Sequence, residues 1–246
     1  MFKNEVFIMK KSMKWLLGIV ITLVVLVAIV VGFIKNKEYQ PSATATIAAQ
    51  NSTVINNTIK FQGYDTRPKV IFYPGALVDP NSYSIWANKV AEAGYSVYIV
   101  RFPLDLAVLN VNAASKIQGN SDYIIGGHSL GGTMASRYAK NHQKKLKGVF
   151  FLASYPEKKG DLHEIKVPIL SLTGTNDGVL NYTNYKKAKK LLPNNTVYEQ
   201  ISGGNHAGFG SYGKQSGDSP ASISNAKQQN IISKLLINWL NHTISE

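Results

Sequence analysis

The chain has 246 residues, of which 44% are hydrophobic and 17% are charged, and its formal net charge is +13. This length allows one sizeable domain with some chain to spare, and the composition excludes collagen-like, low-complexity and disordered classes. The absence of cysteine excludes disulfides, a thiolate nucleophile and cysteine-ligated metal sites. The positive charge favours an anionic neighbourhood such as a membrane or a cell wall. The lysine clusters themselves are interpreted as solvated helix faces. Nucleic acid is not expected as a partner, because these clusters come without interleaved aromatic residues or a DNA-binding motif.

Residues 15–34 form an apolar run without a charged residue, followed by chain rich in small polar residues. As a helix rising about 1.5 Å per residue, such a run spans the ~30 Å hydrocarbon core of a membrane. Lysines are more frequent before the run than after it, which predicts a cytoplasmic N-terminus and an extracytoplasmic body at the cell membrane. A cleaved signal peptide is the alternative, although its apolar part usually has only about 7–15 residues. We therefore predict a basic segment over 1–14, a single-pass anchor over 15–34, a tether over 35–52 and a folded domain over 53–246.

The folded domain alternates short β-type runs with helical patterns. Strands are predicted at 70–73, 95–100, 123–125, 146–153, 167–173 and 196–201. Helices are predicted at 82–93, 106–117, 130–140, 185–192 and 223–240. This alternation predicts an α/β fold in which a mainly parallel, doubly wound sheet carries helices on both faces. Functional residues are then expected at the carboxyl ends of the strands, where such sheets bind their ligands.

Residues 127–131 read Gly-His-Ser-Leu-Gly between a predicted strand and a predicted helix. This is the G-x-S-x-G pattern in the strand–turn–helix context of a nucleophilic serine. Ser129 would sit on a tight, strained turn that raises its hydroxyl above the sheet, and side chains at 127 and 131 would clash with nearby backbone. The free N–H groups at the start of the following helix would face the reacting oxygen. The pattern predicts that Ser129 is a nucleophile, with a purely structural glycine-rich turn as the alternative.

A serine nucleophile needs a general base and an acid that orients the base. His206 follows the last predicted strand in a glycine-rich loop, from which an imidazole can reach the carboxyl edge of the sheet. Asp177 follows the strand over 167–173 and is the predicted acid. Asp161, which precedes a strand, and Asp105, which precedes the serine, are the alternatives. The other histidines are interpreted as structural or surface residues: His128, His142, His163 and His242.

With the chain order Ser129, Asp177, His206, the sequence resembles the α/β-hydrolase superfamily, in particular its compact, dienelactone-hydrolase-like members of the fold-5 type. The resemblance covers roughly residues 53–246. It is carried by the segments 73–76 (Tyr-Pro-Gly-Ala), 126–132 (Gly-Gly-His-Ser-Leu-Gly-Gly), 174–177 (Gly-Thr-Asn-Asp) and 203–206 (Gly-Gly-Asn-His). It implies an eight-stranded sheet. The sequence shows fewer strand-like runs, so the first strand is expected to be missing or degenerate.

The resemblance also implies an oxyanion hole built from two backbone N–H groups. One belongs to Leu130, and the other belongs to Ala76 after the strand over 70–73, with Leu77 as the alternative. The family usually has His-Gly where this sequence has Pro-Gly, a small departure because the donors are backbone groups. Dienelactone hydrolases themselves use a cysteine nucleophile, so the lack of cysteine argues against that activity.

These features predict a membrane-anchored, extracytoplasmic serine hydrolase, in the first place a carboxylic-ester hydrolase that works through an acyl-enzyme. Its partners would be the membrane, through residues 15–34, and an acyl ester that is small or exposed on a surface. An acyltransferase with the same triad and a non-catalytic binding module on the same fold are the alternatives. No cofactor and no metal are expected, because the sequence lacks a dinucleotide fingerprint, a phosphate-binding motif and metal-ligand spacing. Little chain is available for a lid, which favours small or exposed acyl groups.

Overall fold

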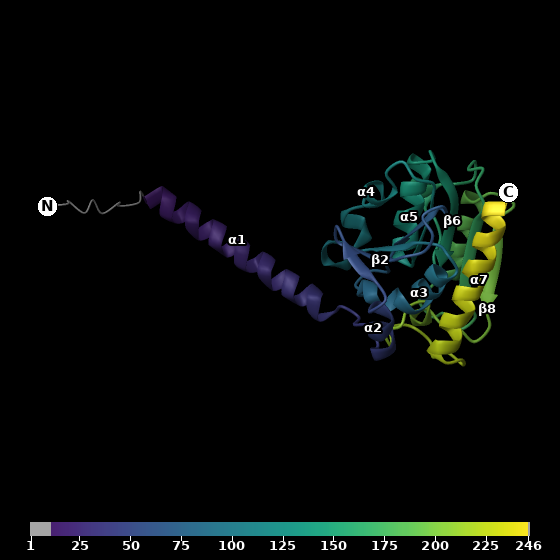
Figure 1. The fold of residues 1–246 in the computed structure, drawn as a ribbon. Helices are drawn as coiled ribbons and strands as arrows, with labels where there is room; N and C mark the ends of the chain where they lie inside the picture. Colours follow the sequence, from purple (N-terminus) through teal and green to yellow (C-terminus); the bar gives the residue numbers. More distant parts are fainter. Residues whose placement is uncertain (1–10, 246) are drawn as a thin grey trace. The chain divides into compact units, whose positions relative to one another are not determined.

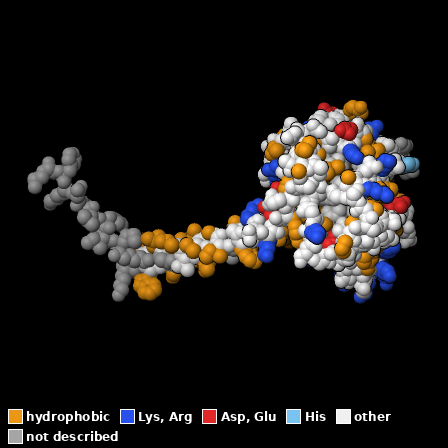
Figure 2. Space-filling model, turned by 90° about the horizontal axis from the view of Figure 1, so that it is seen from below, with side chains coloured by type: hydrophobic (Ala, Val, Ile, Leu, Met, Phe, Trp, Pro, Cys, Tyr) orange, Lys and Arg blue, Asp and Glu red, His pale blue; other side chains and the backbone are white. Residues whose placement is uncertain are grey.

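The computed structural model describes residues 11–245 of the chain, which divides into two compact units between residues 38 and 39. In the first unit, helix α1 (Lys11–Asn36) is the long apolar element that the sequence predicts (Figure 1). Its part Trp15–Asn36 contains a stretch with a mean hydropathy of 3.2, none of which is buried, and Figure 2 shows hydrophobic side chains along it. At about 1.5 Å per residue this helix is long enough to cross a membrane. Residues 1–10 of the predicted basic segment lie outside the described residues.

The second unit is built on one sheet of eight strands. The strands are β1 (Thr53–Ile55), β2 (Thr58–Phe61), β3 (Lys69–Tyr73), β4 (Val97–Val100), β5 (Tyr123–His128), β6 (Leu146–Leu152), β7 (Ile169–Gly174) and β8 (Val197–Ile201). They lie in the order β1-β2-β4-β3-β5-β6-β7-β8. The pairs β1–β2 and β2–β4 are antiparallel, and every pair from β4 to β8 is parallel. The mainly parallel sheet expected from the sequence is therefore confirmed.

Helices cover both faces of this sheet. They are α2 (Ala43–Ala49), α3 (Ser84–Glu92), α4 (Ala114–Gln118), α5 (Leu130–Asn141), α6 (Tyr182–Ala188) and α7 (Asn225–Ser245). Short 3-10 turns are η1 (Pro80–Tyr83), η2 (Pro103–Asp105), η3 (Ala107–Leu109), η4 (Lys158–Gly160), η5 (Lys189–Leu191) and η6 (Ala207–Phe209). Neighbouring residues of β5 enter different cores: Ile124 shares one with Trp86 of α3, and Ile125 shares the other with Met134 of α5. The two cores on opposite faces confirm the doubly wound architecture.

The first two strands correct the expectation of a missing or degenerate first strand. Both are present as a hairpin closed by Asn56 and Asn57, whose φ angles are 47° and 59°. Two positive φ values in a two-residue loop are typical of a type I′ turn, for which asparagine is well suited. The hairpin is hard to see in the sequence because β1 has only three residues, all of them exposed, and β2 only four.

Two predicted helices differ from the structure. The segment over 106–117 is not one helix, because Asn110 leaves the helical conformation (φ −153°, ψ 67°) between η3 and α4. Asparagine favours such breaks because its side chain competes for backbone hydrogen bonds. The helix predicted over 185–192 begins earlier, at Tyr182, because the side chain of Asn181 caps its N-terminus.

The predicted tether over 35–52 is folded from Tyr39 onward. The N–H of Tyr39 donates to the carbonyl oxygen of Leu77 (2.7 Å), and its own carbonyl oxygen accepts from the N–H of Asp79 (3.0 Å). Ser42 then caps helix α2, which packs against α3. The folded unit therefore begins earlier than predicted. The sequence does not reveal this because α2 consists of alanine and threonine around a single isoleucine, a composition that also suits a linker.

We expect Tyr39→Ala to destabilise the domain by about 1–3 kcal/mol, because it removes a partly buried ring from the core. The ring lies 5.4 Å from that of Tyr212, and its hydroxyl accepts the N–H of Ser216 (3.2 Å). Thermal unfolding of the full chain in detergent would measure the effect, since 1 kcal/mol shifts Tm by about 2–4 °C in a domain of this size.

The matched control is Ile47→Ala in helix α2, whose side chain is exposed. It should change the free energy of unfolding by no more than about 0.5 kcal/mol. If Tyr39→Ala leaves Tm as unchanged as this control does, residues 39–52 behave as the tether that the sequence predicts.

Candidate active site

Ser129 occupies a strained turn between β5 and α5. Its backbone lies at φ 51° and ψ −125°, a region that residues other than glycine rarely adopt. A β-carbon on Gly131 would overlap the carbonyl oxygen of Tyr73, and one on Gly127 would lie 2.5 Å from the backbone of Gly131. Glycine at both positions therefore lets the first turn of α5 approach the ends of β3 and β5 closely. This geometry is that of a serine presented at the carboxyl edge of a sheet.

Asp177 and His206 meet at the same edge, after β7 and β8. His206 Nδ1 lies 2.8 Å from Asp177 Oδ2, and both side chains are at most 1% exposed. The other carboxylate oxygen of Asp177 accepts the N–H groups of Val179 (2.9 Å) and Leu180 (2.7 Å). Because the carboxylate can only accept, His206 donates from Nδ1, and its Nε2 carries the free lone pair. That Nε2 is buried and has no hydrogen-bond partner among the described residues.

Ser129 and His206 line one cavity of about 230 Å³. Its other lining residues are Leu130, Thr133, Ala153, Ser154, Tyr155, Val179, Leu180 and Asn181. None of the hydrogen bonds of residues 11–245 joins the serine hydroxyl to the imidazole, so the two groups share the cavity without a direct bond. In unliganded sites of this kind the bond from nucleophile to base is often long and shortens when substrate binds.

In the described part of the chain, the backbone N–H groups of Leu130 and Ala76 are without a partner, and Leu130 lines the cavity with Ser129, whereas Ala76 does not. Leu130 is the first residue of α5, where an N–H has no acceptor within its own helix. Around Ala76 the neighbouring donors are occupied: the N–H of Gly75 donates to Tyr83 Oη (2.9 Å) and that of Leu77 to the carbonyl oxygen of Asp105 (3.0 Å). Of the two alternatives that the sequence offers, Ala76 therefore keeps its N–H available, whereas Leu77 does not.

A buried Tyr83–His128 pair contacts both the loop that carries Gly75 and Ala76 and the imidazole of His206. Burial raises the pKa of Tyr83, so its hydroxyl keeps its proton while accepting from Gly75. The hydroxyl lies 2.9 Å from His128 Nδ1 and donates its proton there. Burial, and then the neighbouring His206, hold the pKa of His128 well below its ordinary value of 6.5. His128 therefore stays neutral, with its ring centroid 4.5 Å from that of His206.

The alternative acids and bases lie in other surroundings. Asp161 Oδ1 contacts His163 Nδ1 (2.8 Å) in an exposed loop. His142 and His242 each place Nδ1 against the carbonyl oxygen four residues earlier in their own helix. Asp105 lies in η2, where its carbonyl oxygen accepts the N–H of Leu77. None of these five residues lines the cavity that Ser129 and His206 share.

Sequence reasoning missed Tyr83 and Ser154. Tyr83 lies in η1, inside a segment that reads as the start of a helix, so nothing local indicates its contact with His128. Ser154 follows β6 and donates its hydroxyl to the carbonyl oxygen of Ser129 (2.6 Å). Its place after a parallel strand is the one signal that could have drawn attention to it. Over residues 11–245, no group of three His, Asp or Glu side chains is arranged to hold a metal ion.

Comparison with known proteins places these residues in a family context. Residues 69–230 match the model of the alpha/beta hydrolase family. A dienelactone hydrolase from Anabaena variabilis superposes with a TM-score of 0.57 at 15% identity, over 78% of this chain and 95% of that chain. A monoacylglycerol lipase from Paleococcus ferrophilus gives 0.57 at 14% identity (76% and 98%), and a thermophilic esterase from Thermogutta terrifontis gives 0.54 at 12% (78% and 97%). These structures share the fold. No curated protein matches the chain.

We expect the buried His128 to make the protein less stable in mild acid. Because its pKa is depressed in the folded state, only the unfolded chain binds a proton there as the pH falls below 6.5. The free energy of unfolding should then fall by up to about 1.4 kcal/mol per pH unit on account of this residue. In His128→Asn, whose side-chain oxygen can accept from Tyr83 in place of Nδ1, the slope should be smaller by about that amount. Chemical unfolding at several pH values would measure both slopes.

The control is His242→Asn, because His242 is exposed near the end of α7. It should keep the wild-type slope. Equal slopes for the wild type and His128→Asn would show that His128 takes up a proton in the folded state as readily as in the unfolded chain.

Proposed function

The chain belongs to the α/β-hydrolase family, and from that premise we propose that it is a serine hydrolase of carboxylic esters. Ser129 is the nucleophile, His206 the general base and Asp177 the acid that orients it. The observation that carries the proposal is the buried Asp177–His206 pair. His206 keeps its Nε2 without a partner among the described residues, and it lines one cavity with Ser129. Esterases and lipases among proteins of the same fold support an ester as the substrate.

The reaction follows from the positions of these groups. His206 Nε2 takes the proton of the Ser129 hydroxyl as the oxygen attacks the acyl carbon. Asp177 keeps the proton of the imidazole on Nδ1 and stabilises the imidazolium that forms. The N–H groups of Leu130 and Ala76 bind the oxyanion, and one such donor is typically worth about 2.7–4 kcal/mol. Nε2 then protonates the leaving alcohol, and water releases the acyl group by the reverse sequence.

The cavity favours a short acyl group. Its volume is about 230 Å³, below the ~300–1,000 Å³ of pockets that enclose drug-sized ligands. The residues that line it include no Asp, Glu, Lys or Arg. An uncharged acyl chain of a few carbons fits these surroundings better than a long chain or an acyl group that carries a charge.

We expect Ser129→Ala to abolish both ester hydrolysis and covalent labelling by a fluorophosphonate probe, because the variant lacks the attacking oxygen. The full chain in detergent would be assayed on p-nitrophenyl esters of graded acyl length. Labelling would be read by mass spectrometry of the modified peptide.

The matched control is Ser202→Ala, which removes an exposed serine after β8. It should keep wild-type rates and labelling. Labelling that persists in Ser129→Ala would contradict the assignment of the nucleophile. A folded wild type without turnover on any of the esters would favour a binding module on this fold.

We propose further that residues 15–34 anchor the protein in the cell membrane, with residues 1–14 in the cytoplasm and the hydrolase domain outside. Helix α1 supports this arrangement, because its most apolar stretch is not buried. The larger number of lysines before the helix supports the orientation.

The expressed chain should remain with the membrane fraction in high salt and alkaline carbonate, because a spanning helix is held by apolar burial rather than by charge. Detergent should release it with its N-terminal peptide intact by mass spectrometry. Protease added to whole cells should digest the hydrolase domain. A soluble protein cleaved after residue 34 would instead identify the segment as a signal peptide.

A further inference from the structure

The loop after His206 carries a carboxylate that binds backbone N–H groups on both sides of the acid–base pair. Asp218 Oδ1 accepts from the N–H groups of Gly178 (3.0 Å) and His206 (3.3 Å), and Oδ2 accepts from that of Ala207 (2.8 Å). Oδ1 also accepts from its neighbour Ser219 (2.9 Å). Gly178 directly follows the acid in the chain, and Ala207 directly follows the base. One carboxylate thus joins two turns that come from different strands.

The chain around Asp218 is shaped to bring the carboxylate to this position. Its N–H donates to the carbonyl oxygen of Gln215 (3.2 Å) and closes a turn. Gly217 in that turn has a φ of 81°, the sign that a type II turn requires at its third residue. A β-carbon on Gly178 would lie 2.7 Å from the backbone nitrogen of Ser219, so the turn packs directly against the residue that follows the acid.

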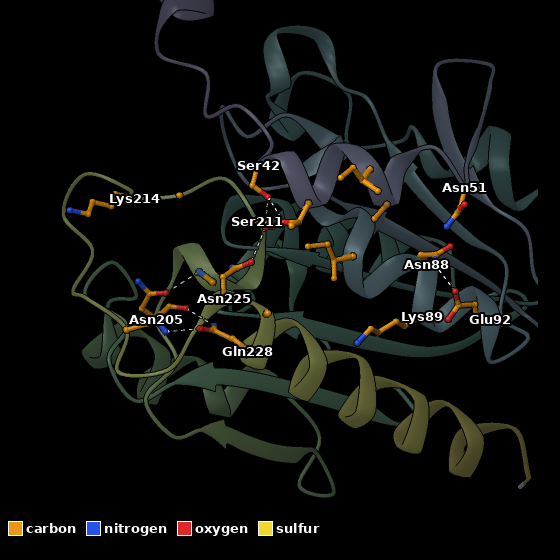
Figure 3. A pocket seen from close by; sticks show the side chains of 18 residues that line it. Ser42, Asn51, Asn88, Lys89, Glu92, Asn205, Ser211, Lys214, Asn225 and Gln228 are labelled. Carbon is orange, nitrogen blue, oxygen red and sulfur yellow. Dashed lines mark hydrogen bonds between the residues drawn. The ribbon is translucent and has the colours of Figure 1, made fainter.

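The opposite side of the His206 segment is held in a different way. Gln228 of α7 is fully buried; its Oε1 accepts the N–H of Asn205 (3.1 Å) and its Nε2 donates to the carbonyl oxygen of the same residue (2.8 Å). Figure 3 shows this pair at the wall of a cavity of about 760 Å³ between α2, α3 and the start of α7. Gln228 therefore holds Asn205, the residue before His206. Asp218 holds His206 itself, together with Ala207 and Gly178, which follow His206 and Asp177 in the chain.

We propose that Asp218 is a positioning residue of the active site, which locks the turn of Asp177 to the turn of His206. The inference rests on the proposed function and names a further residue on which its rate depends. The hydrogen bonds that Asp218 makes to the two turns all come from backbone N–H groups, so it acts through Asp177 and His206 rather than on the substrate. A hydrogen bond to a carboxylate is roughly twice as strong as one between neutral groups.

The loss of this carboxylate would leave three N–H groups of the two turns without an acceptor. His206 and Ala207 are buried, and an unpaired buried donor is costly, so their N–H groups are expected to move toward other acceptors, whereas the exposed Gly178 can turn its N–H to water. A displacement of about 1 Å in a catalytic group can reduce the rate about 100-fold. The displacement would affect proton transfer between Ser129 and His206 more than substrate binding, because Asp218 does not line the cavity next to the serine.

The test compares Asp218→Ala and Asp218→Asn with the wild type, as full chains in detergent, on a p-nitrophenyl ester. We expect Asp218→Ala to lower kcat by about 10–100-fold with KM changed less than about twofold. Asp218→Asn should fall between, because its amide oxygen can still accept from Gly178 and His206 while its NH2 group faces the N–H of Ala207. Added formate should partly restore kcat of Asp218→Ala, because a small carboxylate can occupy the vacated place, whereas chloride at the same ionic strength should not.

The low-field proton resonance of the His206–Asp177 hydrogen bond supplies a readout that does not depend on turnover. We expect it to shift or broaden in Asp218→Ala. The matched control is Asp161→Ala, which removes a loop carboxylate that also accepts a backbone N–H, that of His163 (3.1 Å). This control should keep the wild-type kcat and the wild-type resonance.

A kcat of Asp218→Ala within twofold of the Asp161→Ala control would overturn the proposal, as would an unchanged resonance. A fall in kcat that merely follows the unfolded fraction in both Asp218 variants, without recovery in formate, would also overturn it. If the wild type itself neither hydrolyses esters nor reacts with fluorophosphonate, the proposed function fails. The resonance still decides in that case whether Asp218 holds the Asp177–His206 pair.

Discussion

The candidate active site depends on the parallel pairing of the central strands, which brings their carboxyl ends to one edge. Tyr73 of β3 pairs with Gly127 of β5, so the loop that carries Ala76 starts level with the turn that carries Ser129. The pairs along β6, β7 and β8 then bring the turns of Asp177 and His206 to the same edge. A slip of one residue in any of these pairs would turn its side chains to the opposite face of the sheet. The register of the strands therefore decides which side chains meet at this edge.

Burial at this edge is matched by hydrogen bonding. The carboxylate of Asp177 is out of contact with solvent, yet it accepts two backbone N–H groups and the imidazole of His206. The second imidazole, that of His128, is kept neutral by burial, so it places no positive charge next to His206. A buried charge is tolerated only where it is paired in this way. The site thus holds the carboxylate of Asp177 next to two imidazoles, and Nδ1 of the second, that of His128, lies 2.9 Å from the hydroxyl of Tyr83.

Strain and support are found together in the loops around the site. Ser129 and Leu77 both have positive φ values, of 51° and 57°, and each is fixed by a hydrogen bond from its own N–H to a neighbouring segment. Strained backbone persists only where the surroundings over-determine it. Asp218 and Gln228 provide the same kind of support to the segment of His206. These loops are consequently held by hydrogen bonds from their backbone N–H groups. The side chains of Asp218 and Gln228 act as acceptors for some of these bonds.

The sequence by itself determined the alternation of strands and helices, the apolar helix near the N-terminus, and the residues proposed as the triad: Ser129, Asp177 and His206. These features are local, because an apolar period or a G-x-S-x-G turn is complete within a few residues. Only the tertiary structure decided that the chain folds from Tyr39 onward, that Tyr83 contacts His128, and that Asp218 binds both turns. Such contacts join residues far apart in the chain, and those of Tyr39 and Asp218 are made to backbone groups that every residue has. No pattern in the sequence predicts them, because the residues meet only after the parallel sheet has brought its loops together.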